Sequence, residues 1–243
     1  MSSPNPSFRF GRESAHPSIF VFRLLVVKTS GRKPATDRYL SKGEKIVYTE
    51  MADKKPLIIL TGGISRRMNR VFKGSLEIDG LSFIELLLRN LSPLFRETLL
   101  VGSQKELERY HGDRRVRIAA DRYTGIGPFA GILTAFEITE AEEIFLCPCD
   151  SPFVSARIAH ELFAARSGFN ADITIPLSDN RFYPLIGIYH RKVIPHIRLL
   201  VERDRNAIRF LFRKCPTLMV HFKDPAPFLN VNTWEEYERL LGK

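Results

Sequence analysis

The sequence lacks the features that mark several common classes of protein. Among 243 residues it has three cysteines, Cys147, Cys149 and Cys215, too few and too irregularly spaced for a disulfide framework or a zinc finger. No run of about 18 apolar residues occurs, so we expect no membrane-spanning helix. These absences predict a cytoplasmic protein whose thiols stay reduced in the core, with no role at a membrane.

Several catalytic motifs are missing as well. The six histidines are scattered without an H-E-x-x-H pair, and no G-x-S-x-G sequence occurs. The order Lys73-Gly74-Ser75 does not match the phosphate-binding Gly-Lys-Ser/Thr pattern, and no G-x-G-x-x-G follows the strand predicted at residues 57–60. A zinc enzyme, a hydrolase with a catalytic triad and a standard dinucleotide-binding protein are therefore disfavoured.

Positive charge is in excess, at a formal net charge of +10. Residues 1–50 hold nine Lys/Arg and four Asp/Glu, so half of this excess lies in the first fifth of the chain. No lysine-rich tail or basic helix face of the nucleic-acid-binding type is present. We therefore expect an anionic small-molecule partner and no nucleic acid.

The N-terminal region differs from the rest of the chain. It is rich in Ser, Pro and Arg, and its apolar run at residues 19–27 is broken by Arg23, which does not suit a signal peptide. Met51, followed by a short charged lead and an apolar strand, reads as a natural start. We predict that residues 1–55 are a disordered extension or follow a mis-assigned start, with Met51 the true one, and that 56–243 form the domain. N-terminal sequencing of the natural protein tests this prediction.

From Pro56 onward, apolar strands alternate with amphipathic helices. This alternation predicts an α/β fold with a mostly parallel sheet and helices on both faces, in three layers. A helix is expected at residues 82–94, with Ser82 as its cap and Glu85 three residues on. Another begins near Pro128. A single strand is expected at 181–190 and a helix at 206–214.

Polar and glycine residues follow the predicted strands at four places. Ligands bind at the carboxyl ends of the strands in such sheets, so these segments are expected to converge. The four segments are Thr61-Gly62-Gly63, Asp121 with the glycine-rich loop after it, Asp150, and Asn230-Val231-Asn232.

The residue types suit a nucleotide and a metal. Glycines let backbone amides approach phosphate, and Arg66, Arg67 and Lys73 can balance triphosphate charge. Asp150 follows a buried strand, and magnesium is commonly held by one or two carboxylates together with substrate phosphates. Structural explanations also fit each feature. The glycine pair can form a tight turn, Asp150 can cap the next helix, Asp121 can cap its loop, and the two asparagines can satisfy turn amides.

Together these segments resemble those of the molybdenum cofactor guanylyltransferases, a family of MobA-like nucleotidyltransferases. The resemblance covers roughly residues 56–240, with the motifs in the same order as in the family. The matching stretches are Leu60-Thr61-Gly62-Gly63, Arg67-Met68-Asn69, Phe72-Lys73, Asp121 with GPFAG at 127–131, PCDSP at 148–152, and NVNT at 230–233.

The resemblance implies a Rossmann-like nucleotidyltransferase domain and a reaction. In it, Mg²⁺-dependent transfer of GMP from GTP to molybdopterin forms the guanine dinucleotide cofactor and releases pyrophosphate. The implied partners are GTP, molybdopterin, and proteins that make the cofactor or accept it. The implied roles are catalysis by Arg67, Lys73 and Asp150; nucleotide binding by Leu60, Thr61, Gly62, Gly63, Lys73, Asp121 and Asp150; metal binding by Asp150; and pterin binding by Asn230 and Asn232.

Three departures from the family pattern leave alternatives open. Phe72 replaces an aspartate before the lysine, Asn69 replaces a glycine, and Gly102-Ser103-Gln104 stands where the family has an asparagine-containing turn. One alternative is another nucleotidyltransferase, using CTP or acting on a sugar or alcohol phosphate. The other is a catalytically silent nucleotide-binding protein that assists cofactor delivery. The Gly-Gly pair disfavours the cytidylyl branch, which usually carries Ala-Ala-Gly there.

Overall fold

The structure is a computed structural model of the chain, and it describes residues 24–28, 55–62, 68 and 71–242. Within these residues, nine strands form one mixed sheet in the order β1-β11-β8-β10-β7-β2-β5-β6, with β9 paired to β8. All pairings on the main path are parallel except those of β10, which runs antiparallel to both neighbours. The prediction of an α/β fold with a mostly parallel sheet is confirmed.

The strands of this sheet are short. They are β1 Leu24–Lys28, β2 Pro56–Leu60, β5 Glu97–Gly102, β6 Arg117–Ala120, β7 Glu143–Pro148, β8 Ile173–Ser178, β9 Arg181–Phe182, β10 Gly187–His190 and β11 Thr217–His221. A separate hairpin consists of β3 Glu77–Ile78 and β4 Leu81–Ser82. The helices are α2 Phe83–Leu91, α3 Gln104–Leu107, α4 Pro128–Thr139, α5 Ala156–Arg166, α6 Val193–Glu202 and α7 Trp234–Leu240.

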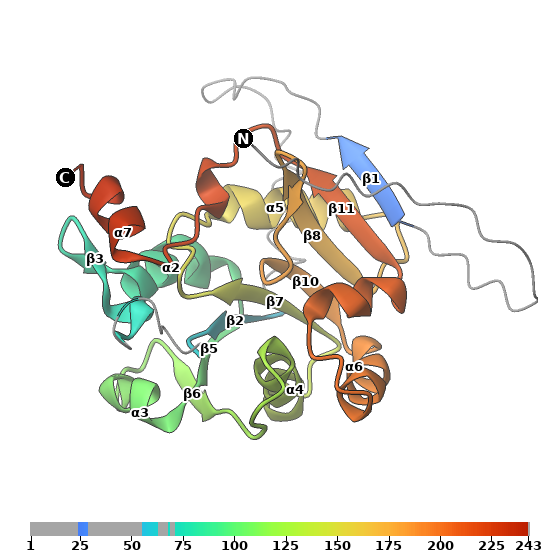
Figure 1. The fold of residues 1–243 in the computed structure, drawn as a ribbon, viewed down its shortest axis with the longest axis horizontal. Coiled ribbons are helices and arrows are strands. Elements are labelled where there is room, and N and C mark those ends of the chain that lie inside the picture. Colours follow the sequence, from blue (N-terminus) through green and yellow to red (C-terminus); the bar gives the residue numbers. More distant parts are fainter. Residues whose placement is uncertain (1–23, 29–54, 63–67, 69–70, 243) are drawn as a thin grey trace, which may run out of the picture.

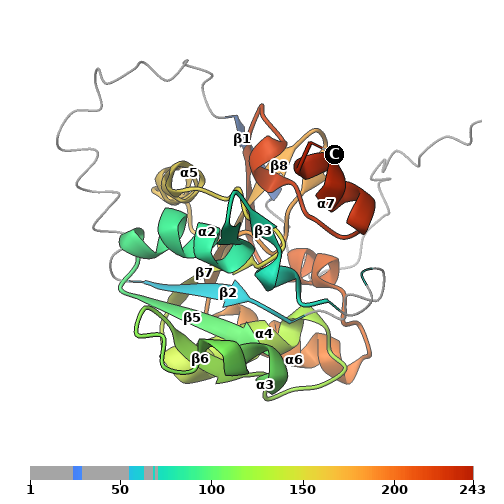
Figure 2. The ribbon, with the colours of Figure 1, turned by 90° about the vertical axis from the view of Figure 1, so that its left-hand side faces the viewer.

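Helices cover both faces of the sheet, as Figures 1 and 2 show. Residues of β2 alternate between two cores, because successive side chains of a strand point to opposite faces. Leu57 and Ile59 pack with α2 and α5 in one core. Ile58 and Leu60 pack with α4 and α6 in the other. A central strand buried on both sides explains its continuous apolar sequence, and the three-layer prediction is confirmed.

Local signals placed two helix starts correctly. Ser82 caps α2 through a capping box, in which its hydroxyl accepts from the Glu85 N–H and the Glu85 carboxylate accepts from the Ser82 N–H. Pro128 occupies the first position of α4. Both features depend only on neighbours within three residues, which is why the sequence reveals them.

Three predicted elements differ in the structure. The strand expected at 181–190 is divided into β9 and β10, because the chain turns at Pro184 and Leu185. The helix expected at 206–214 is a 3₁₀ helix, Ile208–Arg213. The helix expected at 82–94 ends at Leu91 and continues as a 3₁₀ turn around Pro93, which cannot donate a backbone hydrogen bond.

Part of the N-terminal region contributes to the sheet. Strand β1 pairs in parallel with β11 at one edge, with Leu24 opposite Thr217 and Lys28 opposite His221. In Figure 1, β1 is the blue arrow at the end of the sheet. Apart from β1 and Lys55, the range 1–55 lies outside the described residues. The disordered or mis-assigned N-terminus therefore stays a prediction.

Two expectations from composition concern thiols and membranes. All three cysteines are buried free thiols, and burial raises the pKa of Cys215 to about 12. Among the described residues, no helix has both the length and the apolar character needed to cross a membrane.

Candidate active site

A cavity of about 610 Å³ lies at the carboxyl ends of the central strands. It takes residues from the ends of β2, β6 and β7, from the start of α4, and from the segment between β11 and α7. This is the edge where ligands bind in doubly wound sheets. Its lining residues are Leu60, Thr61, Gly62, Lys73, Val101, Asp121, Tyr123, Gly125, Gly127, Pro128, Ala130, Gly131, Pro148, Cys149, Asp150, Leu185, Asn230 and Asn232.

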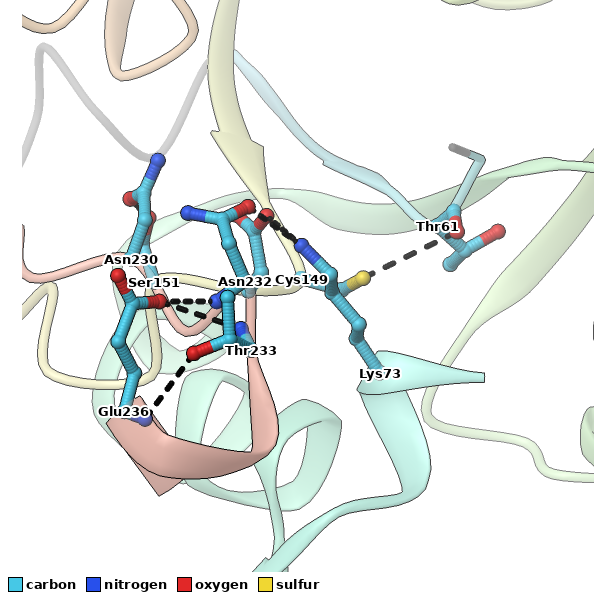
Figure 3. Close-up of polar contacts among 9 residues, drawn as sticks. Thr61, Lys73, Cys149, Ser151, Asn230, Asn232, Thr233 and Glu236 are labelled. Atoms are coloured by element: carbon cyan, nitrogen blue, oxygen red, sulfur yellow. Dashed lines mark hydrogen bonds and ion pairs between the residues drawn. The ribbon is translucent and has the colours of Figure 1, made fainter. Parts of the chain in front are cut away.

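Lys73 joins two of the strand-end segments. Its Nζ lies 3.0 Å from Asp150 Oδ2 and 2.6 Å from Asn232 Oδ1, and Figure 3 shows the Lys73 ammonium reaching Asn232. The Lys73 and Asp150 side chains are only 14% and 19% exposed. Because the Lys73 ammonium is largely removed from water, it interacts more strongly with a nearby charge than an exposed ammonium would. The arrangement suits an anionic ligand next to a cation-binding oxygen.

The two asparagines are held by the chain around them. The Val231 N–H donates to Asp150 O over 3.0 Å, which ties their segment to the end of β7. The Asn232 N–H donates to Glu236 Oε2 over 2.6 Å. Asn230 Oδ1 bonds the Ser151 hydroxyl. Figure 3 shows Asn230, Asn232 and Glu236 beside Lys73. The backbone bonds of Val231 and Asn232 fix where Asn232 presents its side-chain oxygen.

Asp121 lies on the opposite side of the same cavity, between two glycines. A Cβ at Gly62 would lie 3.3 Å from Asp121 Oδ2, and one at Gly131 would lie 3.8 Å from Asp121 Oδ1. Burial raises the pKa of Asp121, and the negative charge of Glu106 adds to this. Among the described residues, Asp121 Oδ1 is buried without a hydrogen-bond partner. A carboxylate in this position suits a ligand that donates hydrogen bonds.

The backbone at the end of β2 is partly committed to the sheet. Leu60 O accepts from the Cys149 N–H over 2.9 Å, and the Thr61 N–H donates to Val101 O over 2.8 Å. Leu60 therefore lines the cavity through its side chain. On this strand, the first main-chain groups that are left to bind a ligand come after the Thr61 N–H.

Helix α4 directs its N-terminus into the cavity. Its cap is Gly127, with φ of 59°, a left-handed conformation that glycine adopts without strain. Pro128 and Ala130 follow in the first turn and line the cavity. The N-terminal end of a helix carries partial positive charge, so α4 adds to the anion-binding character of the site.

The family model described as the MobA-like NTP transferase domain matches residues 57–218, about two thirds of the chain. The chain belongs to the MobA-like NTP transferase family. The strand-end residues Thr61, Gly62, Asp121 and Asp150, which line the cavity, fall within the matched range, whereas Asn230 and Asn232 lie beyond it.

Relatives of this family are similar over nearly their whole length. A protein of Geobacillus sp. (strain WCH70), named probable molybdenum cofactor guanylyltransferase, is 31% identical over 76% of this chain and 96% of its own. A Methanosarcina mazei protein of the same name is 33% identical over 76% of this chain and 89% of its own.

A solved structure supports the fold. The crystal structure of molybdopterin-guanine dinucleotide biosynthesis protein A from Archaeoglobus fulgidus aligns with a TM-score of 0.66. The alignment covers 77% of this chain and 97% of that one, at 22% identity.

Most predicted site residues meet in the cavity of this MobA-like domain. Those that line it are Leu60, Thr61, Gly62, Lys73, Asp121, Asp150, Asn230 and Asn232. Arg66, Arg67 and Gly63 lie outside the described residues, so their predicted roles are untested. The structural alternatives for the acidic residues are not seen: Ser155, not Asp150, is the cap residue of α5, and Asp121 Oδ1 caps nothing.

Sequence reasoning did not single out several lining residues, among them Val101, Tyr123 and Leu185. Tyr123 follows Asp121 in the loop before α4, and its hydroxyl bonds Glu137 on that helix. Leu185 reaches the cavity from the connection between β9 and β10. The only signal for Leu185 was Pro184, which interrupts an otherwise continuous strand pattern.

Gly102 is required where β2 and β5 end side by side. A Cβ at Gly102 would lie 2.0 Å from Thr61 Oγ1 and 2.9 Å from Gly62 N. We expect Gly102→Ala to lower the free energy of unfolding by about 1–3 kcal/mol through overpacking, measured by urea denaturation. Thr61→Ala with Gly102→Ala should recover part of the loss, because the hydroxyl contact is gone. A single variant as stable as the parent would contradict this packing.

Asp121→Asn should raise stability while weakening ligand binding. A raised pKa means that the folded state disfavours the charged carboxylate, so the ionised Asp121 lowers the free energy of unfolding at neutral pH. This loss disappears as the pH falls toward 4. We expect the variant to melt about 1–3 °C higher at pH 7, a small gain because the group is partly solvated. The gain should vanish near pH 4. The exposed Asp224→Asn is the control, and a lower melting temperature for Asp121→Asn at pH 7 would contradict the reasoning.

Proposed function

We propose that this MobA-like protein transfers GMP from GTP to the terminal phosphate of molybdopterin, forming the guanine dinucleotide cofactor and releasing pyrophosphate. One observation carries the proposal: Lys73, Asp150 and Asn232 meet within hydrogen-bonding distance at the edge of a cavity that Asp121 also lines. The names of the relatives point to the same reaction. A cytoplasmic location and contacts with cofactor-synthesis or acceptor proteins accompany the proposal as predictions.

Asp150 fits a magnesium ion. Its Oδ1 is buried without a hydrogen-bond partner among the described residues, while Oδ2 accepts from Lys73. Within the described chain, no group of three or more His, Cys, Asp or Glu side chains could hold a metal. Magnesium needs only one or two carboxylates when substrate phosphates complete its shell. When bound, Mg²⁺ supplies charge neutralisation and orientation of the phosphate oxygens.

The protein's own side chains supply what the nucleotidyl transfer needs besides Mg²⁺. The acceptor phosphate oxygen forms a bond to the α-phosphorus of GTP, and the bond from that phosphorus to the bridging oxygen of pyrophosphate breaks. Lys73, held by Asp150 and Asn232, offsets the repulsion between the two anions and the charge that develops on the α-phosphate. No protein nucleophile is required. Leu60, Val101 and Ala130 give the cavity apolar walls.

Asp121 and the two asparagines mark the two ends of the substrate site. Asp121 faces the half of the cavity formed by Gly62 and the start of α4, where we place the nucleoside of GTP. Asn230 and Asn232 lie at the other end, where we place the pterin. The phosphates then lie between them, next to Lys73 and Asp150.

A thermal-shift comparison tests the nucleotide. The purified chain is heated with Mg²⁺ and GTP, CTP or ATP, each supplied far above its expected dissociation constant. A ligand at 100 times its Kd stabilises by about 2.7 kcal/mol, which corresponds to about 5–10 °C for a domain of this size. We expect the largest shift with GTP.

The alternatives predict different results. A larger shift with CTP would reject the guanylyl reading and favour a cytidylyltransferase. Binding of GTP without pyrophosphate release, in the presence of molybdopterin on an acceptor protein, would favour a silent nucleotide-binding protein. Formation of the dinucleotide in the same mixture would establish the proposed reaction.

A further inference from the structure

Phe72 and Lys73 are consecutive residues whose side chains lie on opposite sides of one turn. The Phe72 side chain is buried, at 9% exposure, in the core beneath α2 and α5. The Lys73 side chain lines the cavity and bonds Asp150 and Asn232. The backbone between them therefore connects the packing of the core directly to the position of the ammonium group.

Two side chains hold the Phe72 ring in place. The Arg109 guanidinium lies over it, 4.8 Å from the ring centroid. The Tyr110 ring meets it edge to face, with centroids 6.5 Å apart and planes at 72°. Both geometries are attractive ones for an aromatic ring. Both side chains come from the 3₁₀ turn Glu108–Tyr110, which is distant in sequence from Phe72.

The ring also packs under its own turn. A Cβ at Gly74 would lie 2.5 Å from Phe72 Cζ and 2.7 Å from Ile84 Cδ1, so the space beneath Gly74 is filled by these two side chains. Ser75 completes the turn, because its N–H and its hydroxyl both donate to Phe72 O, over 3.1 and 2.8 Å. The turn Lys73–Ser75 is thus anchored through Phe72 to α2 and to the segment after α3.

We propose that Phe72 is a positioning residue that fixes the Lys73 ammonium against Asp150 and Asn232. Lysine has a long, flexible stem, and a defined position for its ammonium requires that its backbone be held. A displacement of about 1 Å in a catalytic group can cost on the order of 100-fold in rate. The catalytic part of this inference rests on the proposed function, whereas the positioning itself is a structural statement that can be tested without any nucleotide.

The first test measures the chemical exposure of Lys73. The protein is treated with an acetylating reagent, and the rate of acetylation at Lys73 is followed by peptide mass spectrometry. We expect a rate several-fold higher in Phe72→Ala than in the parent, because the ammonium is released from its two acceptors. Phe72→Leu, which refills most of the space, should return the rate toward that of the parent.

Phe95→Ala is the matched control. Phe95 is 7% exposed in the same core and packs against Phe145 and Phe163, away from the residues that line the cavity. Both alanine variants should lower the melting temperature, but only Phe72→Ala should expose Lys73. Acetylation of Lys73 that is equal in the two variants, measured well below their melting temperatures, would overturn the inference.

The second test is a double-mutant cycle on catalysis. Phe72→Ala should lower kcat/KM by about 10- to 100-fold, whereas Phe95→Ala should leave it near that of the parent. Adding Phe72→Ala to Lys73→Ala should cause little further loss, because Phe72 acts through the lysine. If the two substitutions instead lower kcat/KM independently, so that their losses multiply, Phe72 does not act through Lys73. If the acetylation result holds but no nucleotide stabilises the protein, the proposed function fails while the positioning role stands.

Discussion

Asp150→Asn is expected to lower kcat/KM for nucleotidyl transfer by at least about 10²–10³-fold and to remove its dependence on Mg²⁺. The amide keeps the size of the side chain and can still accept a hydrogen bond from Lys73, so the loss should come from the charge. The buried Oδ1 has no hydrogen-bond partner among the described residues, so under the proposed function we expect this carboxylate to provide the oxygen that holds Mg²⁺. Pyrophosphate release at varied Mg²⁺ concentration measures both effects.

The fold should survive this substitution. Asp150 O, which accepts from the Val231 N–H, belongs to the backbone and is unchanged. Asp224→Asn is the control, because Asp224 is exposed, lies outside the cavity lining and makes its contact through an oxygen that asparagine retains. Turnover close to that of the parent in Asp150→Asn would show that another residue holds the metal.

Lys73→Ala is expected to produce the second large effect. It removes the ammonium that contacts Asp150 and Asn232. Among the described residues that line the cavity, Lys73 is the only one with a cationic side chain. We expect kcat/KM to fall by about 10²-fold or more and GTP to bind more weakly, measured by steady-state kinetics and by calorimetry. Lys73→Arg should restore little, because a planar guanidinium cannot occupy the same point between two acceptors.

Lys105→Ala supplies the comparison for this lysine. Lys105 is exposed on α3 and takes no part in the cavity, so the substitution removes the same charge without touching the site. It should change kcat/KM by less than about twofold, because exposed charges far from a site act weakly in salt. Equal losses in the two variants would mean that overall charge, rather than the position of Lys73, governs the activity.

The sequence could predict those parts of the fold that depend on near neighbours. The alternation of apolar strands with helices gave the three layers, because burial on one or two faces leaves a periodic pattern. The Ser82 cap could be read because its partner Glu85 is three residues away. The strand expected at 181–190 was wrong because the turn at Pro184 depends on how β10 enters between β8 and β7.

The site could be predicted in composition but not in geometry. The residues at the strand ends were predictable because the carboxyl ends of parallel strands meet at one edge. The contact between Lys73 and Asn232 spans 159 positions, and no local pattern indicates that the asparagine orients the lysine. Leu185 likewise reaches the cavity only because the chain turns there.

By itself, the sequence determined that this is a MobA-like α/β protein and which residue types gather at the ends of its strands. Hydrophobic periodicity and strand-end motifs depend only on residues that are close together in the sequence. The tertiary structure alone decided that Lys73 lies between Asp150 and Asn232, that one carboxylate oxygen of Asp121 is buried near two glycines, and that Phe72 anchors the turn. The physical reason is that distances and desolvation between remote segments arise only when the layers pack.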